Sequence, residues 1–122
     1  MTKAAAIYQF WSGFGLTAYE ENTVPEDATF SYITYQLVTD SFGREVAATA
    51  SLWYRGESWT AINAKTEEIA QHIGLGGKII KCDGGRIWIK RGQPFAQNMS
   101  DESDDLIKRK YLNLTFEFLT AN

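Results

Sequence analysis

Few residues in this 122-residue chain have the type and spacing that catalysis or the binding of a phosphate or metal ion requires. The segment Gly74-Leu75-Gly76-Gly77-Lys78 superficially resembles a phosphate-binding loop. That motif has a longer spacing, a Ser or Thr after the Lys and a helix downstream, whereas here Ile79 follows and the next residues fit a strand. We interpret the segment as a helix stop followed by a turn.

A second candidate lies among the acidic residues near the C-terminus. Asp101, Ser103 and Asp105 have the spacing of the first ligands of a calcium loop. Leu106 stands where that loop requires Gly, and Leu112 where it requires a bidentate Glu. An EF-hand is therefore excluded, and we expect no metal and no cofactor.

The remaining candidates are a histidine and a cysteine. The only His, His72, follows Glu68 by one helical turn, which is more typical of a surface contact than of a catalytic dyad. The lone Cys82 lies in a predicted strand without a neighbouring base, as is typical of a small buried thiol. Because no catalytic constellation emerges, we expect a protein that is not an enzyme.

Two helices are predicted, one capped by Thr2 and one that runs from an N-cap at Ser58 to Gly74. Their apolar residues recur at three- and four-residue steps. These residues are Ile7, Phe10, Trp11 and Phe14 in the first helix, and Trp59, Ile62, Thr66, Ile69 and Ile73 in the second.

Alternating apolar and polar residues predict the strands. They cover 30–39, 44–54, 78–82, 86–90 and 110–119, while 16–29 (apart from a short strand near 16–19) and 92–105 are expected to be irregular. The small residues Ala48 and Ala50 share a face with Val46 and Leu52, which indicates that a helix packs close to them. Because strands and helices do not alternate, we expect one α+β domain over residues 1–122, with a mainly antiparallel sheet of four to five strands flanked by two helices.

The aromatic residues give the clearest indication of function. Tyr32, Trp53 and Trp88 fall on the strand faces opposite to the core stripes, among polar neighbours and Arg86. Aromatic residues in such surroundings are typical of a protein interface. The alternative is that the stretches 16–29 and 92–105 fold over this face and bury the rings inside the subunit.

The acidic residues form one further group. No basic residue occurs from the start of this group until Lys108, so its carboxylates repel one another unless they are solvated or face a basic partner. The group consists of Asp101, Glu102, Asp104 and Asp105. The chain as a whole carries a net charge of −3, which disfavours avid binding to DNA.

Several short segments, taken in order, carry a family resemblance. They are Ile7–Trp11, Ala18–Glu21, Val24–Pro25, Tyr32–Tyr35, Trp53–Arg55, Trp59, Trp88–Lys90 and Tyr111–Leu114. This order, over nearly the whole chain, resembles the small neck proteins of long-tailed bacteriophages or prophages, called minor capsid or tail terminator proteins in phages of Gram-positive hosts. The resemblance implies a structural protein with an antiparallel sheet flanked by helices and without catalytic residues.

The resemblance also implies partners and a location. A tail terminator forms an oligomeric ring, expected to be a hexamer, that caps the tail tube and joins it to the head connector. Genomic DNA would pass through the ring without specific binding, and no membrane is involved, since no run approaches the roughly 18 apolar residues of a membrane span. We therefore expect the protein in the virion, assembled in the cytoplasm of a bacterial host.

Alternatives remain at two levels. The acidic group either lines the hole of the ring or is a solvent-exposed loop that becomes ordered on docking. The whole chain could instead be a head-completion or minor tail component, or a stand-alone small-ligand binding domain that uses the aromatic sheet face.

Overall fold

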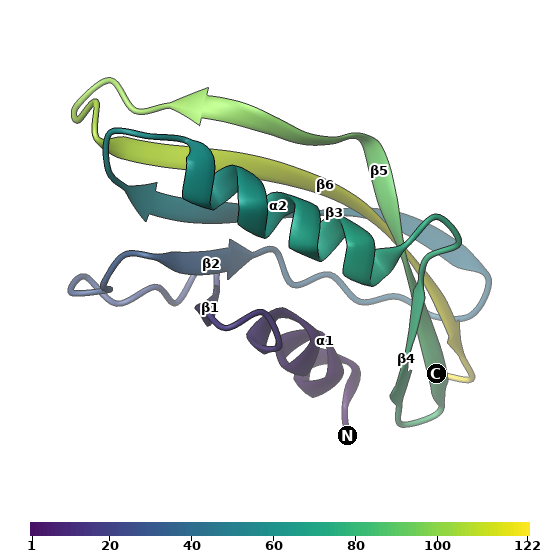
Figure 1. Ribbon diagram of the computed structural model, residues 1–122. Coiled ribbons are helices and arrows are strands. Elements are labelled where there is room, and N and C mark those ends of the chain that lie inside the picture. Colours follow the sequence, from purple (N-terminus) through teal and green to yellow (C-terminus); the bar gives the residue numbers. More distant parts are fainter.

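Six strands form one sheet, which curls around two helices on its concave side (Figure 1). The computed structural model describes residues 1–122. The elements follow one another as α1 (Lys3–Ser12), β1 (Thr17–Glu20), β2 (Tyr32–Tyr35), β3 (Arg44–Arg55), α2 (Thr60–Ile73), β4 (Lys78–Cys82), β5 (Gly85–Ser100) and β6 (Ile107–Thr120). The domain is α+β, as predicted.

The strands lie in the order β1-β2-β3-β6-β5-β4. β1 and β2 are parallel, and all other neighbouring pairs are antiparallel. The prediction of four to five strands is therefore corrected to six in a mixed sheet. The sixth strand is β1, which matches the short strand expected near 16–19 and has four residues with only Ala18 buried. Residues 21–31 return the chain to the start of β2, as a parallel pair requires.

Helix α1 joins the two edges of the curled sheet. Thr2 caps the helix, because its Oγ1 accepts a hydrogen bond from the Ala5 N–H at 3.1 Å. The predicted apolar face, from Ile7 to Phe14, is buried. α1 contacts β1 at one edge and β4 at the other. The helix thus covers the gap that the curl leaves between the edge strands (Figure 1).

Helix α2 contacts β3, β5 and β6 in the middle of the sheet. Its N-cap is Trp59 rather than the predicted Ser58, although the Ser58 Oγ accepts a hydrogen bond from the Thr60 N–H at 3.0 Å. Trp59 is half-buried, and the Lys110 ammonium lies 5.4 Å from its ring. Gly74 ends the helix at a φ of 76°. The buried stripe matches the prediction: Ile62, Thr66, Ile69 and Ile73.

One hydrophobic core lies between the sheet and the helices. Along β6, every second residue is buried. The apolar ones, from Leu112 to Phe118, join the isoleucines of the α2 stripe in a single cluster. Across the register, Ala48 and Ala50 lie opposite Leu114 and Leu112. Their small size lets α2 approach β3, which confirms that a helix packs against this part of the strand.

The stretch 92–105, predicted to be irregular, is mostly strand. β5 continues through a register shift between Arg91 and Ala96, and then pairs with β6 as far as Ser100. Gly92 and Pro94 are typical strand breakers, but the bulge accommodates both of them. A side chain at Gly92 would meet the Asn113 carbonyl oxygen at 2.9 Å, so glycine is required where the bulge approaches β6.

The predicted strand at 30–39 is shorter than expected, because β2 covers only Tyr32–Tyr35. Leu37 has the same strand parity as the buried Ile33 and Tyr35, yet it is 38% exposed. At Tyr35 the neighbouring β1 also ends, with Glu20 as the last paired residue. A longer β2 would therefore have an outer edge without a partner.

Candidate functional site on the uncovered sheet face

One face of the sheet has no helix over it (Figure 1), and we call it the open face. Tyr32, Trp53 and Trp88 all lie on this face, as predicted from their strand parity. All three are half-buried. Of the two segments that could have folded over them, residues 92–100 belong to β5 and residues 17–20 to β1. Their role in an interface stays a prediction.

A row of side chains crosses the open face from β1 to β6. The Tyr19 ring lies 5.8 Å from that of Tyr32, which stacks on Trp53 at 6.2 Å with 21° between the planes. The Arg109 guanidinium carbon lies 4.7 Å from the Trp53 ring centre and 5.4 Å from that of Tyr111. We call these five residues the aromatic row. Stacking and cation–π contacts hold each member against the next.

Hydrogen bonds beneath the aromatic row fix its orientation. The Trp53 indole N–H donates to the Thr34 Oγ1 at 2.8 Å, and the Arg109 Nε donates to the Ser51 Oγ at 3.0 Å. Thr34 and Ser51 are only 9% and 3% exposed, because the row covers them. Burial also raises the pKa of Tyr32, so its hydroxyl stays neutral. The row is therefore a largely apolar, rigid surface with one permanent cation.

Trp88 belongs to a second group at the other end of the open face. Its indole N–H donates to the Gly76 carbonyl oxygen at 2.8 Å, and the Lys90 ammonium lies 4.1 Å from its ring centre. Lys90 also pairs with Glu117 at 3.2 Å and with Glu45. The hydrogen bond from Lys90 lowers the pKa of the Glu45 carboxyl. This ion-pair group holds the Trp88 ring in place.

The β4–β5 hairpin adds exposed side chains beside Trp88. Ile79 lies opposite Trp88 and is 51% exposed. Lys81 lies opposite Arg86, and both are exposed. Neither cation takes part in an ion pair. We call these four residues the hairpin patch, which combines an apolar centre with two free cations.

The three residues predicted from the sequence therefore share one face but form two groups. Sequence reasoning missed three members of the aromatic row: Tyr19, Arg109 and Tyr111. Arg109 and Tyr111 lie at positions of β6 whose side chains point away from the core. The alternation of apolar and polar residues in the sequence already indicated this. Tyr19 gave no such signal, because β1 is too short.

The predicted acidic group forms a tight connection between β5 and β6. The Asp101 carboxylate accepts hydrogen bonds from the Ser103 hydroxyl at 2.6 Å and its N–H at 2.8 Å, which lower the pKa of Asp101. Asp104 pairs with Arg55 at 3.3 Å. The other two carboxylates are exposed and have no side-chain hydrogen bond or ion pair: Glu102 and Asp105.

The predicted contact between Glu68 and His72 is wrong. Glu68 pairs with Lys65 at 3.0 Å, and His72 lies edge-on to Phe14 with ring centres 5.2 Å apart. Lys65 lies on the same helix face as Glu68, three residues before it, and its ammonium pairs with the carboxylate.

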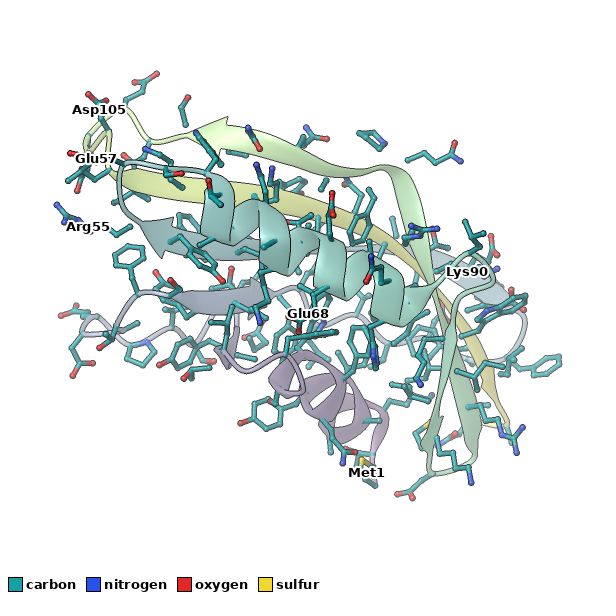
Figure 2. All side chains as sticks on the ribbon, in the orientation of Figure 1. Met1, Arg55, Glu57, Glu68, Lys90 and Asp105 are labelled. Atoms are coloured by element: carbon teal, nitrogen blue, oxygen red, sulfur yellow. The ribbon has the colours of Figure 1, made fainter.

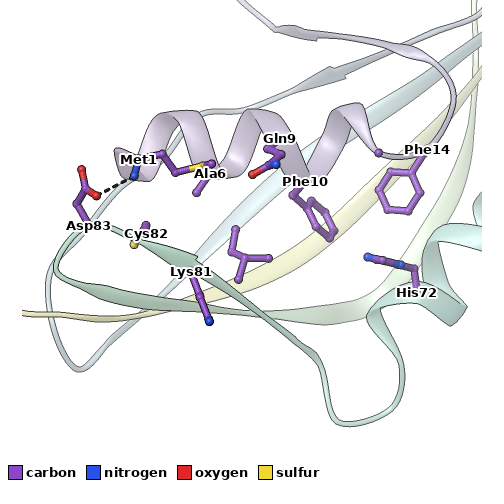
Figure 3. Close-up of a pocket in the computed structure, with 11 residues that line it drawn as sticks. Met1, Ala6, Gln9, Phe10, Phe14, His72, Lys81, Cys82 and Asp83 are labelled. Carbon is purple, nitrogen blue, oxygen red and sulfur yellow. Dashed lines mark hydrogen bonds and ion pairs between the residues drawn. The ribbon is translucent and has the colours of Figure 1, made fainter.

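A pocket of about 530 Å³ lies between α1 and β4 (Figure 3). Cys82 and His72 both line it, but Figure 3 shows them at opposite ends. The N-terminal amino group pairs with Asp83 at 2.7 Å beside the Cys82 end. This separation leaves the thiol without the adjacent base that a nucleophile needs. The structure contains no group of three or more His, Cys, Asp or Glu side chains that could hold a metal ion.

The glycine-rich segment at 74–78 is a helix end and turn, as predicted. Gly74 and Gly77 have φ values of 76° and 85°, and the Gly77 N–H donates to the Gly74 carbonyl oxygen at 3.4 Å. Lys78 then begins β4. The segment therefore lacks the downstream helix of a phosphate loop.

None of the helices is long and apolar enough to cross a membrane. Comparisons with protein-family models, curated proteins and solved structures found no match to this chain. The choice of a candidate functional site therefore depends on the geometry of the structure alone. That site is the open face, with the aromatic row at one end and the hairpin patch at the other.

Proposed function

We propose that this chain is a structural protein of phage virion assembly, a tail terminator that caps the tail tube and joins it to the head connector as an oligomeric ring. The observation that carries the proposal is the aromatic row on the open face. Tyr, Trp and Arg are the residue types enriched at the energetic centres of interfaces. The family resemblance of the sequence supports the same role.

The proposed ring is built from contacts between unlike surfaces of neighbouring copies, which close on themselves after a fixed number of subunits. Six copies would form the ring. One rim would bind the last ring of the tail tube protein and the other rim the head–tail connector. Genomic DNA would cross the hole without specific binding, since a net charge of −3 does not retain phosphates.

The replacement Trp53→Ala tests this assembly role. Loss of the Trp53 indole side chain should weaken association between copies by about 30-fold or more, as expected for an interface anchor worth about 2 kcal/mol. Sedimentation velocity measures self-association, and electron microscopy measures capping of tubes grown from the tail tube protein. Tyr8→Ala is the matched control, because Tyr8 is an exposed aromatic residue on α1, away from the open face.

Trp53 also has contacts inside the subunit, so the free energy of unfolding of each variant must be measured in parallel. Loss of monomer stability without a separate loss of assembly would place the role of Trp53 inside the subunit. A native protein that neither self-associates nor caps tail tubes would contradict the proposal. Binding of a small molecule by a permanent monomer would instead favour the ligand-binding alternative, and ring formation without tube capping would favour a head-completion or minor tail component.

A further inference from the structure

More than half of the 15 Asp and Glu residues of the chain gather at one end of the molecule. Three connections leave the sheet there: residues 21–31, 56–59 and 101–106 (Figure 1). The Gly56 N–H donates to the Leu106 carbonyl oxygen at 2.8 Å, and Figure 2 shows Glu57 beside Asp105. The three connections contain eight carboxylates and no Lys or Arg. We call them the acidic end.

The aromatic row borders the acidic end. Trp53 lies two residues before the last residue of β3, and Arg109 two residues after the first residue of β6. Tyr32 directly follows the connection 21–31. The row and the acidic end therefore form one continuous surface, with rings at its centre and carboxylates along one side.

The hairpin patch has the opposite character and lies away from the acidic end (Figure 1). Ile79 and Trp88 form its centre, and Lys81 and Arg86 lack carboxylate partners within the subunit. Each surface thus has an apolar centre beside an excess of charge of one sign: carboxylates outnumber Arg109 at the first, and Lys81 and Arg86 flank the second. One subunit cannot bring them together, because they lie on different ends of one rigid sheet.

We propose that the hairpin patch of one copy docks on the aromatic row and acidic end of the next copy. Complementary charge selects the partner and its orientation, and the two apolar centres supply the buried contact. Each copy presents both surfaces, so the contact is heterologous and closes into a ring when its rotation permits. This inference rests on the proposed assembly function and adds which two surfaces meet.

A charge-swap experiment tests the pairing. One variant carries Lys81→Glu with Arg86→Glu, and the other carries Glu57→Lys, Glu102→Lys and Asp105→Lys. All five residues are exposed and none has an ion pair, so the monomers should stay folded. Either variant alone should associate about 100-fold more weakly than the native protein, because like charges then face each other.

An equimolar mixture of the two variants should restore association. Each reversed surface then meets an oppositely charged one, and native mass spectrometry should find the two variants in equal numbers. Raising the salt concentration should weaken the native assembly, since exposed charges are screened. Glu67→Lys is the control, because Glu67 is exposed and unpaired on α2, outside both surfaces.

Two results would overturn the pairing: variants that associate like the native protein, or folded variants whose mixture fails to associate. If Trp53→Ala blocks assembly while the charge reversals do not, the assembly role stands and the pairing is wrong. A native protein that stays monomeric at low salt also contradicts the pairing, whereas capping of tail tubes would still support the assembly role.

Discussion

At the scale of single residues, the open face owes its rigidity to polar side chains beneath its rings. Thr34 and Ser51 are buried hydroxyls, each bonded to a member of the aromatic row. An unpaired buried hydroxyl would cost about 1–3 kcal/mol, so these bonds restrict the orientations that Trp53 and Arg109 adopt. A surface fixed before binding loses less conformational entropy on association.

Phe116 tests the placement of the core. It is 1% exposed and contacts Phe118 edge-on at 6.3 Å, within the same cluster as Ile62 and Ile69. Phe116→Ala should lower the free energy of unfolding by about 3–5 kcal/mol, because it removes buried apolar area and leaves a cavity. Chemical denaturation measures the loss.

The control for this change is Phe42→Ala, because Phe42 is 70% exposed. It should alter stability by no more than about 0.5 kcal/mol. Equal denaturation midpoints for Phe116→Ala and the native protein would mean that β6 does not present this face to the core.

Single residues were predictable where periodicity marked them. The stripe of α2 and the alternating residues of β6 lie in the core as expected, because each repeats often enough to fix a face. The division of the aromatic residues into two groups was not predictable. It depends on the register that places Trp53 opposite Arg109 and Trp88 opposite Glu117, and parity alone does not give register.

At the scale of elements, the close packing of α2 on the sheet depends on small side chains in β3. Ala48 and Ala50 on β3 occupy little volume on the concave side, where α2 contacts that strand. On the opposite side of the same strand, Ala47 is exposed. The strand therefore offers neighbouring alanines that point into and out of the core.

Enlarging the alanine that faces the core should destabilise the protein, whereas enlarging the exposed one should not. Ala50→Leu should lower the free energy of unfolding by about 1–3 kcal/mol, because the extra carbons must displace α2 from β3. Ala47→Leu, three residues away on the open face, should change it by about 0.5 kcal/mol or less. Thermal and chemical denaturation compare the two variants. Similar losses for both would contradict the packing of α2 on this strand.

The features of the sheet that the sequence did not indicate share one property: each depends on a distant partner. The parallel pairing of β1 with β2 has no local signal, and residues 96–100 extend β5 only because β6 is long enough to receive them. Local signals at Gly92 and Pro94 favoured an irregular stretch. Tertiary pairing overrode them, with a bulge as the local adjustment.

At the scale of the whole molecule, the two ends of the sheet differ in charge. Strand direction brings three acidic connections to one end, while the β4–β5 hairpin carries its unpaired cations away from them (Figure 1). The five ion pairs within the subunit leave this separation in place. Such a molecule favours association of unlike ends over association of like ends.

Neutralising the acidic connection between β5 and β6 tests what this end of the molecule does. The variant changes Asp101, Asp104 and Asp105 to Asn and Glu102 to Ser, which removes four charges. The Asn side chains can still accept the local hydrogen bonds of the turn. Loss of the half-exposed pair with Arg55 should cost at most about 1 kcal/mol, so the monomer should stay folded.

The stage at which assembly fails identifies the role of these carboxylates. From the proposed pairing of subunits we expect weaker self-association in sedimentation velocity, before any effect on later stages. Intact rings with unjoined tails and filled heads would instead assign the carboxylates to docking on another virion protein. Intact rings, normal joining and poor DNA delivery would place them in the hole of the ring, where their charge keeps phosphates moving.

Glu67→Gln, which removes one exposed charge from α2, is the control and should leave every stage unchanged. Normal association, joining and infectivity of the neutralised variant would mean that the connection is only solvated surface and would remove it from the proposed contact between copies.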